Sequence, residues 1–390
     1  IHDTAFSSTA NTTKMQRLTA TRQQTPSPPP LPTLPLELVE EILWRLPVKH
    51  LLQLRCVCKP WKTLISNPQF AKKQLLLCGS PKENRLIVKF SSMQFHEFTL
   101  RSYPLPSIFN PDVASAATNL TFTYPFSYRL PTRIVGSCDG ILCLSVDGSP
   151  AFLWNPSIGK SKTLPLLHKC GKFPMCGFGY DRCAGSYKVV SIFHNFKANT
   201  EVKVLTLGTD YWRSIRDQFP DNVSPLDYWG PFVGDSINWL ARRVDVPKSW
   251  VIVSLDLRNE TFGEVSQPDY RDLIVTLSLS VLRDCLCLLS GTQGSLDVWL
   301  MKDYGNKKSW TKLHKHDYYD GIFRDYYRVK ALNVSEDDHQ VLLHYSYESV
   351  LIVYNSKDRT VKIPELQNII SEPKLLSATV YVESLISPCS

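Results

Sequence analysis

Hydrophobic positions near the N-terminal end recur with helical spacing over residues 34–70. Leu38 and Ile42 lie four residues apart, and further leucines continue the pattern as far as Pro47. Apolar residues at three- and four-residue intervals indicate an amphipathic helix, and a proline cannot continue its hydrogen-bond ladder. The pattern predicts a first helix that begins near Pro35, where a missing N–H costs nothing, and stops at Pro47.

Two shorter helices are predicted next. The apolar positions of the second are Leu51, Leu54, Val57 and Cys58. Lys59-Pro60-Trp61 then breaks the chain and starts a third helix, which ends before Asn67-Pro68. Helices so apolar on more than one face cannot cover their own surface, so we expect either a partner or the rest of the chain to cover it. A helical hairpin packed on its own domain has the same periodicity.

From about residue 84 the pattern changes to short runs of β-branched and aromatic residues between Gly, Asp, Asn and Pro turns. This pattern predicts an all-β region with no convincing helical stretch. The run 139–145 begins at Asp139, fifteen residues before Trp154. The similar run 284–290 begins at Asp284, also fifteen residues before Trp299. Weaker copies begin at Gly234-Asp235 and at Asp338. Strand repeats of roughly 40 to 50 residues indicate a β-propeller.

The repeats suggest about six blades. Their expected ranges are 84–101, 134–165, 173–215, 230–265, 278–315 and 328–365. The last strand-like run, residues 378–385, is predicted to pair with the first blade, because closing the ring removes an exposed sheet edge. We therefore expect a multidomain chain, with a small all-α module of three helices at 34–75 and an all-β propeller at 84–388.

Residues 1–33 are dominated by Thr, Ser, Gln and Pro. Such a composition cannot bury enough apolar surface to order itself, so a disordered leader is expected. Because the sequence opens with Ile1, Met15 is a candidate initiator.

Charge and cysteine content narrow the class of protein. A net charge of +8 is modest for 390 residues, and scattered Lys and Arg disfavour nucleic-acid binding. Neither a membrane-spanning run nor a secretion signal is evident, so we expect a cytoplasmic or nuclear protein. Eleven cysteines, an odd number, favour buried thiols in a reducing compartment.

No cofactor, metal or catalytic group is expected. One set of residues could be imagined as a zinc site, but it lacks the short spacing of a zinc knuckle. This set is His168, Cys170, Cys176, Cys183 and His194. Two close pairs, Cys56 with Cys58 and Cys285 with Cys287, fit small core residues.

The order of residues in the helical segment resembles an F-box. The matching positions are Leu34-Pro35, Glu37-Leu38, Glu41-Ile42, Leu46-Pro47, Leu51, Arg55, Val57-Cys58-Lys59, Trp61 and Leu64-Ile65. The resemblance implies binding of a Skp-type adaptor, which joins F-box proteins to a cullin and RING ubiquitin ligase. It assigns the adaptor interface, or its support, to Leu34, Pro35, Leu38, Ile42, Leu46, Pro47, Leu51, Val57 and Trp61.

The β region resembles the F-box-associated, kelch-like propeller domain of plant F-box proteins over residues 90–388. Its landmarks are Trp154-Asn155-Pro156-Ser157, Gly177-Phe178-Gly179-Tyr180-Asp181, Tyr187-Lys188-Val189-Val190, Trp212-Arg213, Trp299 with Met301, Tyr304-Gly305 and Trp310-Thr311-Lys312. The tryptophans are expected in blade cores. Arg283-Asp284 departs from the pattern where a glycine turn is expected, and the kelch Gly-Gly doublet is absent.

Together the two resemblances imply a non-catalytic substrate receptor of a ubiquitin ligase. Because Tyr and Arg dominate interface hot spots, we predict substrate contacts from Tyr318, Tyr319, Phe323, Arg324 and Tyr326. The polar-aromatic loop at residues 221–229 is a second candidate. An edge strand with its loop explains both segments as well. A propeller enzyme such as a glycosidase or oxidase, and a scaffold or glycan-binding protein without degradation, remain alternatives.

Overall fold

The computed structural model describes most of the chain beyond the predicted leader. The described residues are 34–78, 84–91, 98–110, 117–120, 132–146, 149–167, 174–195, 198–217, 219–246, 249–269, 274, 276–292, 294–317, 329–346, 349–366 and 374–389. The predicted disorder at 1–33, with Met15, lies outside them. The described chain divides into two units between Glu41 and Ile42.

Four helices, rather than the three predicted, follow residue 34 in the described chain. They are α1 (Leu36–Trp44), α2 (Val48–Leu54), α3 (Lys59–Ile65) and α4 (Pro68–Cys78). Pro68 ends the predicted pattern but also begins α4, where Asn67 Oδ1 accepts a hydrogen bond from the Gln69 N–H at 2.8 Å. A proline suits the first turn of a helix, so the same residue marks both a stop and a start.

The second helix is shorter than predicted. It ends at Leu54, and Val57 and Cys58 lie beyond it in the connection to α3. The Val57 N–H donates to the Leu54 carbonyl in a tight turn, and Cys58 is extended at φ −153°. Pro60 stands inside the first turn of α3, where its missing N–H costs no helical hydrogen bond.

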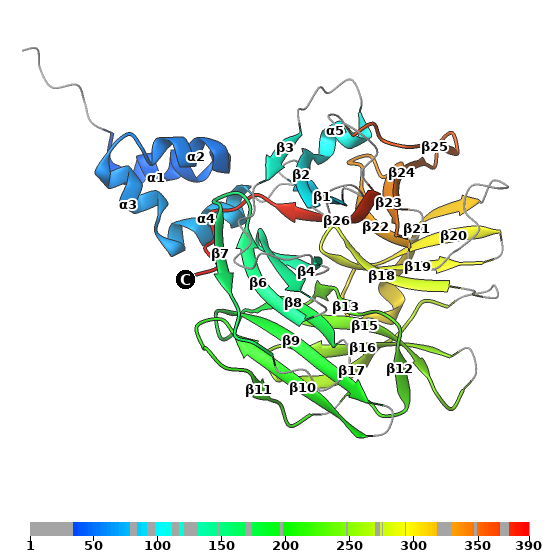
Figure 1. The fold of residues 1–390 in the computed structure, drawn as a ribbon. Coiled ribbons are helices and arrows are strands. Elements are labelled where there is room, and N and C mark those ends of the chain that lie inside the picture. The colour runs from blue at the N-terminus through cyan, green and yellow to red at the C-terminus, as the bar shows by residue number, and fades with distance from the viewer. Residues whose placement is uncertain are drawn as a thin grey trace, which may run out of the picture. The chain divides into compact units, whose positions relative to one another are not determined.

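Six sheets of four or five strands, antiparallel apart from one short added strand, form the propeller in the described part of the chain (Figure 1). Blade 1 contains β1 (Asn84–Ser91), β2 (Phe98–Pro104), β3 (Thr118–Leu120) and β26 (Lys374–Val382). Blade 2 contains β4 (Thr132–Cys138), β5 (Ile141–Val146), β6 (Ser149–Asn155) and β7 (Lys160–Thr163). Blade 3 contains β8 (Met175–Asp181), β9 (Ser186–Asn195), β10 (Ala198–Thr206) and β11 (Arg213–Ser214), with β13 (Trp229–Gly230) added in parallel to β8.

The second half of the ring repeats this plan. Blade 4 contains β12 (Val223–Pro225), β14 (Phe232–Val233), β15 (Ser236–Arg243), β16 (Trp250–Asp256) and β17 (Thr261–Val265). Blade 5 contains β18 (Thr276–Leu282), β19 (Cys285–Gly291), β20 (Ser295–Met301) and β21 (Trp310–Asp317). Blade 6 contains β22 (Val329–Val334), β23 (Gln340–Tyr345), β24 (Val350–Asn355) and β25 (Thr360–Lys362).

The prediction of about six blades is therefore confirmed. The expected all-β region includes two short helical segments, α5 (Leu105–Phe109) and the 3₁₀ helix η2 (Lys307–Ser309). Proline at the second position of α5, and the side chain of Asn306 that caps η2, explain both locally.

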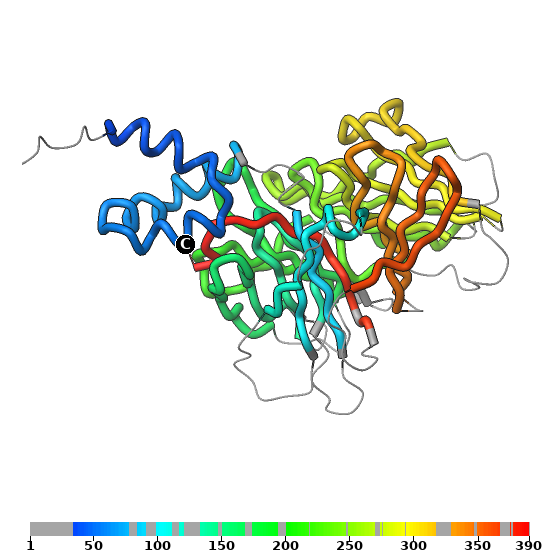
Figure 2. Tube along the Cα trace, turned by 90° about the horizontal axis from the view of Figure 1, so that it is seen from above, coloured from blue at the N-terminus to red at the C-terminus, as the bar shows by residue number. Residues whose placement is uncertain are grey.

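The ring closes where the sequence predicted it. β26, from the C-terminal end, pairs antiparallel with β1, so Lys89 lies opposite Ser377 and Ile87 opposite Thr379. Figure 2 shows the red C-terminal strand beside the cyan strands of blade 1. Hydrogen bonding along the whole of β1 removes the sheet edge that an open ring would expose.

The family landmarks have structural roles at the joints between blades. Trp154 and Trp310 are buried in the cores between sheets. Lys188 Nζ forms ion pairs with Asp181 Oδ2 at 2.8 Å and Glu260 Oε1 at 2.9 Å, and it donates to the Leu257 carbonyl at 2.6 Å. Arg213 also pairs with Glu260. This group of four charged side chains, the Lys188 cluster, connects blade 3 to the turn between the last two strands of blade 4.

Candidate functional site

The first candidate surface begins in residues 34–41. The predicted adaptor residues Leu34 and Leu38 are 60% and 51% exposed, and Pro35 is exposed as well. Leu36, which was not predicted, is equally open to solvent. An exposed run of large apolar side chains is uncommon on a soluble protein and marks an interaction site.

In residues 42–78, Ile42 and Val57 are 52% and 65% exposed, and Pro47 is exposed too. Leu46 and Trp61 are half-buried. Leu51 is fully buried, so among the nine predicted residues it supports the helices from inside.

The helical core explains why the other apolar side chains are left outside. Trp44 packs on Phe70 with ring centres 6.0 Å apart, and Lys73 Nζ lies 3.3 Å from the centre of the Trp44 ring. Gln74 Nε2 donates to the Leu46 carbonyl at 3.3 Å. These contacts join Trp44 and Leu46 to α4 through residues that do not include the exposed ones, so a partner can bind without disrupting the core.

The predicted substrate residues Tyr318, Tyr319, Phe323, Arg324 and Tyr326 all lie outside the described residues. The second candidate, residues 221–229, is partly built into sheets rather than being a free loop. It contains β12 and begins β13, while Leu226 and Tyr228 remain exposed between them.

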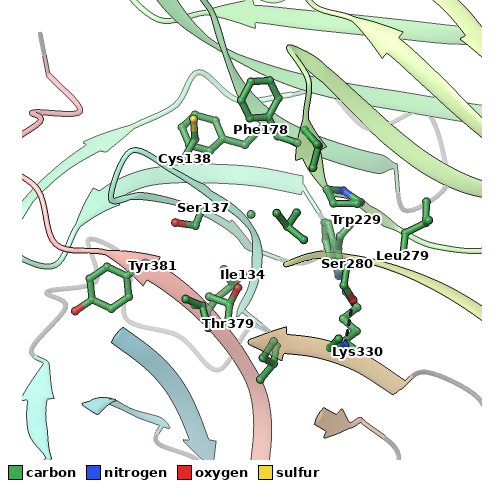
Figure 3. Close-up of a pocket in the computed structure, with 18 of the residues that line it drawn as sticks. Ile134, Ser137, Cys138, Phe178, Trp229, Leu279, Ser280, Lys330, Thr379 and Tyr381 are labelled. Carbon is green, nitrogen blue, oxygen red and sulfur yellow. Dashed lines mark hydrogen bonds between the residues drawn. The ribbon is translucent and has the colours of Figure 1, made fainter. Parts of the chain in front are cut away.

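A second candidate site is the cavity at the centre of the ring, with a volume of about 1360 Å³. Strands from all six sheets contribute to its wall. Figure 3 shows Cys138, Phe178, Trp229, Ser280, Lys330 and Thr379 around it. The cavity forms a channel along the axis around which the propeller strands lie, and different residues line its two ends.

One end of the channel, where β4, β14 and β18 reach their hairpin turns, is rich in acidic residues. Asp139, Asp235 and Asp284 lie in these turns. Burial raises the pKa of Asp139, whose Oδ2 accepts a hydrogen bond from the Tyr187 hydroxyl at 2.9 Å. Asp235 pairs with Arg182 at 3.0 Å. These turns begin the repeats seen in the sequence.

The other end, where β4, β22 and β26 begin, carries basic residues that sequence analysis missed. They are Lys89, Arg133, Lys330 and His344. Their distance apart along the chain conceals their proximity, because each comes from a different strand of the ring. No spacing in the sequence distinguishes them from the other basic residues, so their grouping can be identified only from the three-dimensional structure.

The described residues contain no group of three His, Cys, Asp or Glu side chains placed to hold a metal ion. Burial raises the pKa of the Cys176 thiol to about 12, so this member of the imagined zinc set is a neutral core residue. Cys183 is exposed, and the other three members have no described side chains. Among the helices described, none is long and apolar enough to span a membrane.

Comparison with known families decides the classification. Residues 31–73 match the F-box domain, and residues 90–388 match the F-box associated beta propeller domain. The second match covers most of the chain. The chain is an F-box protein of this propeller family.

Relatives of this F-box protein are found among plant proteins. An F-box/kelch-repeat protein of Arabidopsis thaliana is 31% identical over 366 residues, which cover 91% of this chain and 96% of the relative. The F-box protein CPR1 of the same plant is 26% identical over 389 residues, covering 92% and 89%. Among solved structures, TolB from Acinetobacter baumannii covers 80% of this chain and 72% of its own, at 12% identity and a TM-score of 0.48.

For an F-box protein, the domain at residues 31–73 indicates binding of a Skp-type adaptor. Its combination with a propeller indicates a protein of the substrate-receptor type.

Proposed function

We propose that this F-box protein is the substrate-recognition subunit of an SCF-type ubiquitin ligase. Its F-box would dock the Skp-type adaptor, and through it a cullin and a RING protein, while the propeller captures a protein substrate. The observation that carries the proposal is the exposure of Leu34, Leu38 and Ile42 within a matched F-box. Exposed apolar side chains contribute favourable hydrophobic free energy only when a partner covers them and removes them from water.

The size of this driving force supports a stable complex. Burying Leu34, Leu36, Leu38, Ile42 and Val57 at roughly 1.5 to 3 kcal/mol each amounts to on the order of 10 kcal/mol before the costs of association. The proposal places this complex in the cytoplasm or nucleus.

In this mechanism the chain performs no covalent chemistry. A substrate held beside a ubiquitin-charged conjugating enzyme presents its lysines at a raised effective concentration, so positioning replaces acid, base or nucleophilic groups. The propeller is suited to this task because it displays loops on a rigid frame.

The test is a titration of the full chain with a purified Skp-type adaptor. Replacing both Leu38 and Ile42 by Ala should weaken binding by a factor of at least about ten, since each loses several buried methylene equivalents. The matched control replaces Leu166 and Val244, two exposed apolar residues of the propeller, and should bind as the wild type does.

Equal affinity of both double variants, or no adaptor binding by the folded wild type, would contradict the proposal. Capture from cell extract then separates the alternatives. A ligase receptor should shorten the lifetime of a co-captured protein, whereas a scaffold should bind the adaptor and leave that lifetime unchanged. Hydrolysis of model glycosides by the full chain would instead favour a propeller enzyme.

A further inference from the structure

The basic end of the central channel has the features of a binding site. Lys89 of β1 is only 4% exposed, although a lysine is rarely buried. Its neighbour across the sheet is Ser377 of β26, and both line the channel. Arg133 at the start of β4 and Lys330 at the start of β22 line the same end.

The pKa shifts support this proximity. Burial and then the positive charge of Arg133 lower the pKa of Lys89 to about 8. Burial and then the charge of Lys330 lower the pKa of His344 to about 4. Arg133 of blade 2 acts on Lys89 of blade 1, and Lys330 acts on His344 within blade 6, so positive potential is concentrated at this end of the channel.

His344 supplies an independent observation. It lies directly opposite Lys330 in the pairing of β22 with β23, so both side chains project from the same face of the sheet toward the channel. His344 is only 3% exposed, and its Nε2 has no hydrogen-bond partner among the residues that the structure describes. A buried polar atom without a partner is uncommon and points to a ligand or water.

The hydrogen bond on the other side of the ring decides what Nε2 can offer. Nδ1 lies 3.5 Å from the Ser346 hydroxyl. When that hydroxyl donates to Nδ1, the proton of the neutral imidazole resides on Nε2, which becomes a donor toward the channel. The Ser377 hydroxyl, also buried and without a partner in the described chain, is a further donor in the same cavity.

We propose that this end of the channel binds the phosphate group of a phosphate monoester, held by Arg133, Lys330, His344 and Ser377. A dianion with three terminal oxygens can accept hydrogen bonds from several directions at once, which matches donors supplied by three different sheets. The site stands independently of the proposed function, because it does not require adaptor binding.

The acidic end of the channel does not oppose this assignment. Arg133 and Asp139 are six residues apart on and just after β4, about 20 Å at the rise of a β-strand. Asp139 and Asp235 are moreover engaged by Tyr187 and Arg182. An anion that enters the channel is therefore bound more favourably at the basic end than at the acidic end.

The test measures binding of inorganic phosphate and of phosphoserine to the full chain by calorimetry at low ionic strength. A variant with Arg133→Gln and Lys330→Gln should bind phosphoserine at least about tenfold more weakly, because two charged donors are lost. Its control, Lys160→Gln with Lys362→Gln, removes the same charge from exposed positions on β7 and β25 and should bind as the wild type does. A Lys330→Arg variant keeps the charge and should retain binding.

The source of the phosphate is resolved by a third probe, a short peptide that contains one phosphoserine between glycines. Tighter binding of the peptide than of phosphoserine supports the site and assigns the phosphate to a protein ligand. Equal binding supports the site and assigns it to a small molecule. No saturable binding of any probe to the folded wild type, or equal weakening in the channel and control variants, would overturn the proposal.

Discussion

At the scale of single residues, the hairpin turns at the acidic end of the channel demand left-handed backbone. Asp139 and Gly140 have φ of 51° and 79°, and Arg283 and Asp284 have φ of 50° and 57°. Two consecutive positive φ values describe the type I′ turn that joins twisted antiparallel strands. The missing glycine at Arg283-Asp284 therefore leaves the turn intact, since the strands on both sides impose its conformation.

Gly140 is required for a second reason, which its sequence context does not reveal. A Cβ atom there would lie 2.6 Å from the Val382 carbonyl oxygen and would also clash with Ser384 Oγ. Gly159 has a similar φ of 65°, but nothing lies within 4 Å of its Cβ position. Gly140→Ala should therefore lower the free energy of unfolding by about 3 kcal/mol, from backbone strain and overpacking combined.

The matched variant Gly159→Ala carries the backbone strain alone and should lose only about 1 kcal/mol. Urea denaturation of both variants measures the difference. If the two lose the same amount, the C-terminal segment does not press on Gly140 in solution.

At the scale of elements, the Trp154-Asn155-Pro156-Ser157 landmark anchors the segment that follows the closing strand β26. The Asn155 side chain is fully buried at the end of β6. Its Nδ2 donates to the Ser384 carbonyl at 3.0 Å and to the Ile386 carbonyl at 2.8 Å. The motif thus joins blade 2 to the C-terminal segment, more than two hundred residues away along the chain.

Asn155→Ala should lower the free energy of unfolding by about 2 to 4 kcal/mol, because buried carbonyl groups lose their donors. Asn355 provides the control, since it occupies the corresponding end of β24. Each asparagine accepts a hydrogen bond from the backbone N–H two residues on, at 2.8 Å for Asn155 and 3.0 Å for Asn355. Asn355→Ala should therefore cost about 1 kcal/mol or less.

Chemical denaturation of the two variants measures both losses. Similar losses would mean that only the turn hydrogen bond matters and that Asn155 does not fasten the C-terminal segment.

The positions of helices and strands were largely predictable from the local sequence pattern. The burial or exposure of their individual side chains was not. Periodicity and prolines located α1 and α3, whereas α4 was missed because Pro68 was interpreted only as a stop. The sequence also did not determine which apolar residues of the F-box are exposed to solvent. Leu51 and Val57 belong to one predicted helix, yet one is buried and the other is exposed beyond the end of α2.

At the scale of the whole molecule, repeats in the sequence predicted the number of blades and the closing strand, because each blade is a local unit with its own turn signals. The channel was not predictable in this way. Its basic end gathers Lys89, Arg133 and Lys330 from blades 1, 2 and 6. Chain order does not encode which strands become innermost, so such a site is a property of the closed ring.

The joints between blades predict how the propeller responds to acid. Burial acts to raise the pKa of Asp181 and of Glu260, but hydrogen bonds and ion pairs in the Lys188 cluster bring both below their usual values. A lowered pKa means that the native state binds fewer protons than the unfolded chain. The stabilisation is therefore complete above the usual carboxyl pKa of about 4, and it is lost as the pH falls from there through the lowered native pKa values.

Lys188→Met should remove this dependence. At pH 7 it should cost about 3 kcal/mol or more, because Asp181 is left as a buried carboxylate without its cation. Below pH 4 the difference from the wild type should shrink, since the carboxyls become protonated first in the unfolded chain and, as the pH falls further, in the native wild type. Lys203→Met, which breaks the more exposed pair with Glu201, should cost less than about 1 kcal/mol and leave the acid response unchanged. Urea unfolding between pH 7 and pH 3 measures the free energy of unfolding of all three proteins. If the difference in this free energy between Lys188→Met and the wild type stayed constant across that range, the cluster would not couple the blades through charge.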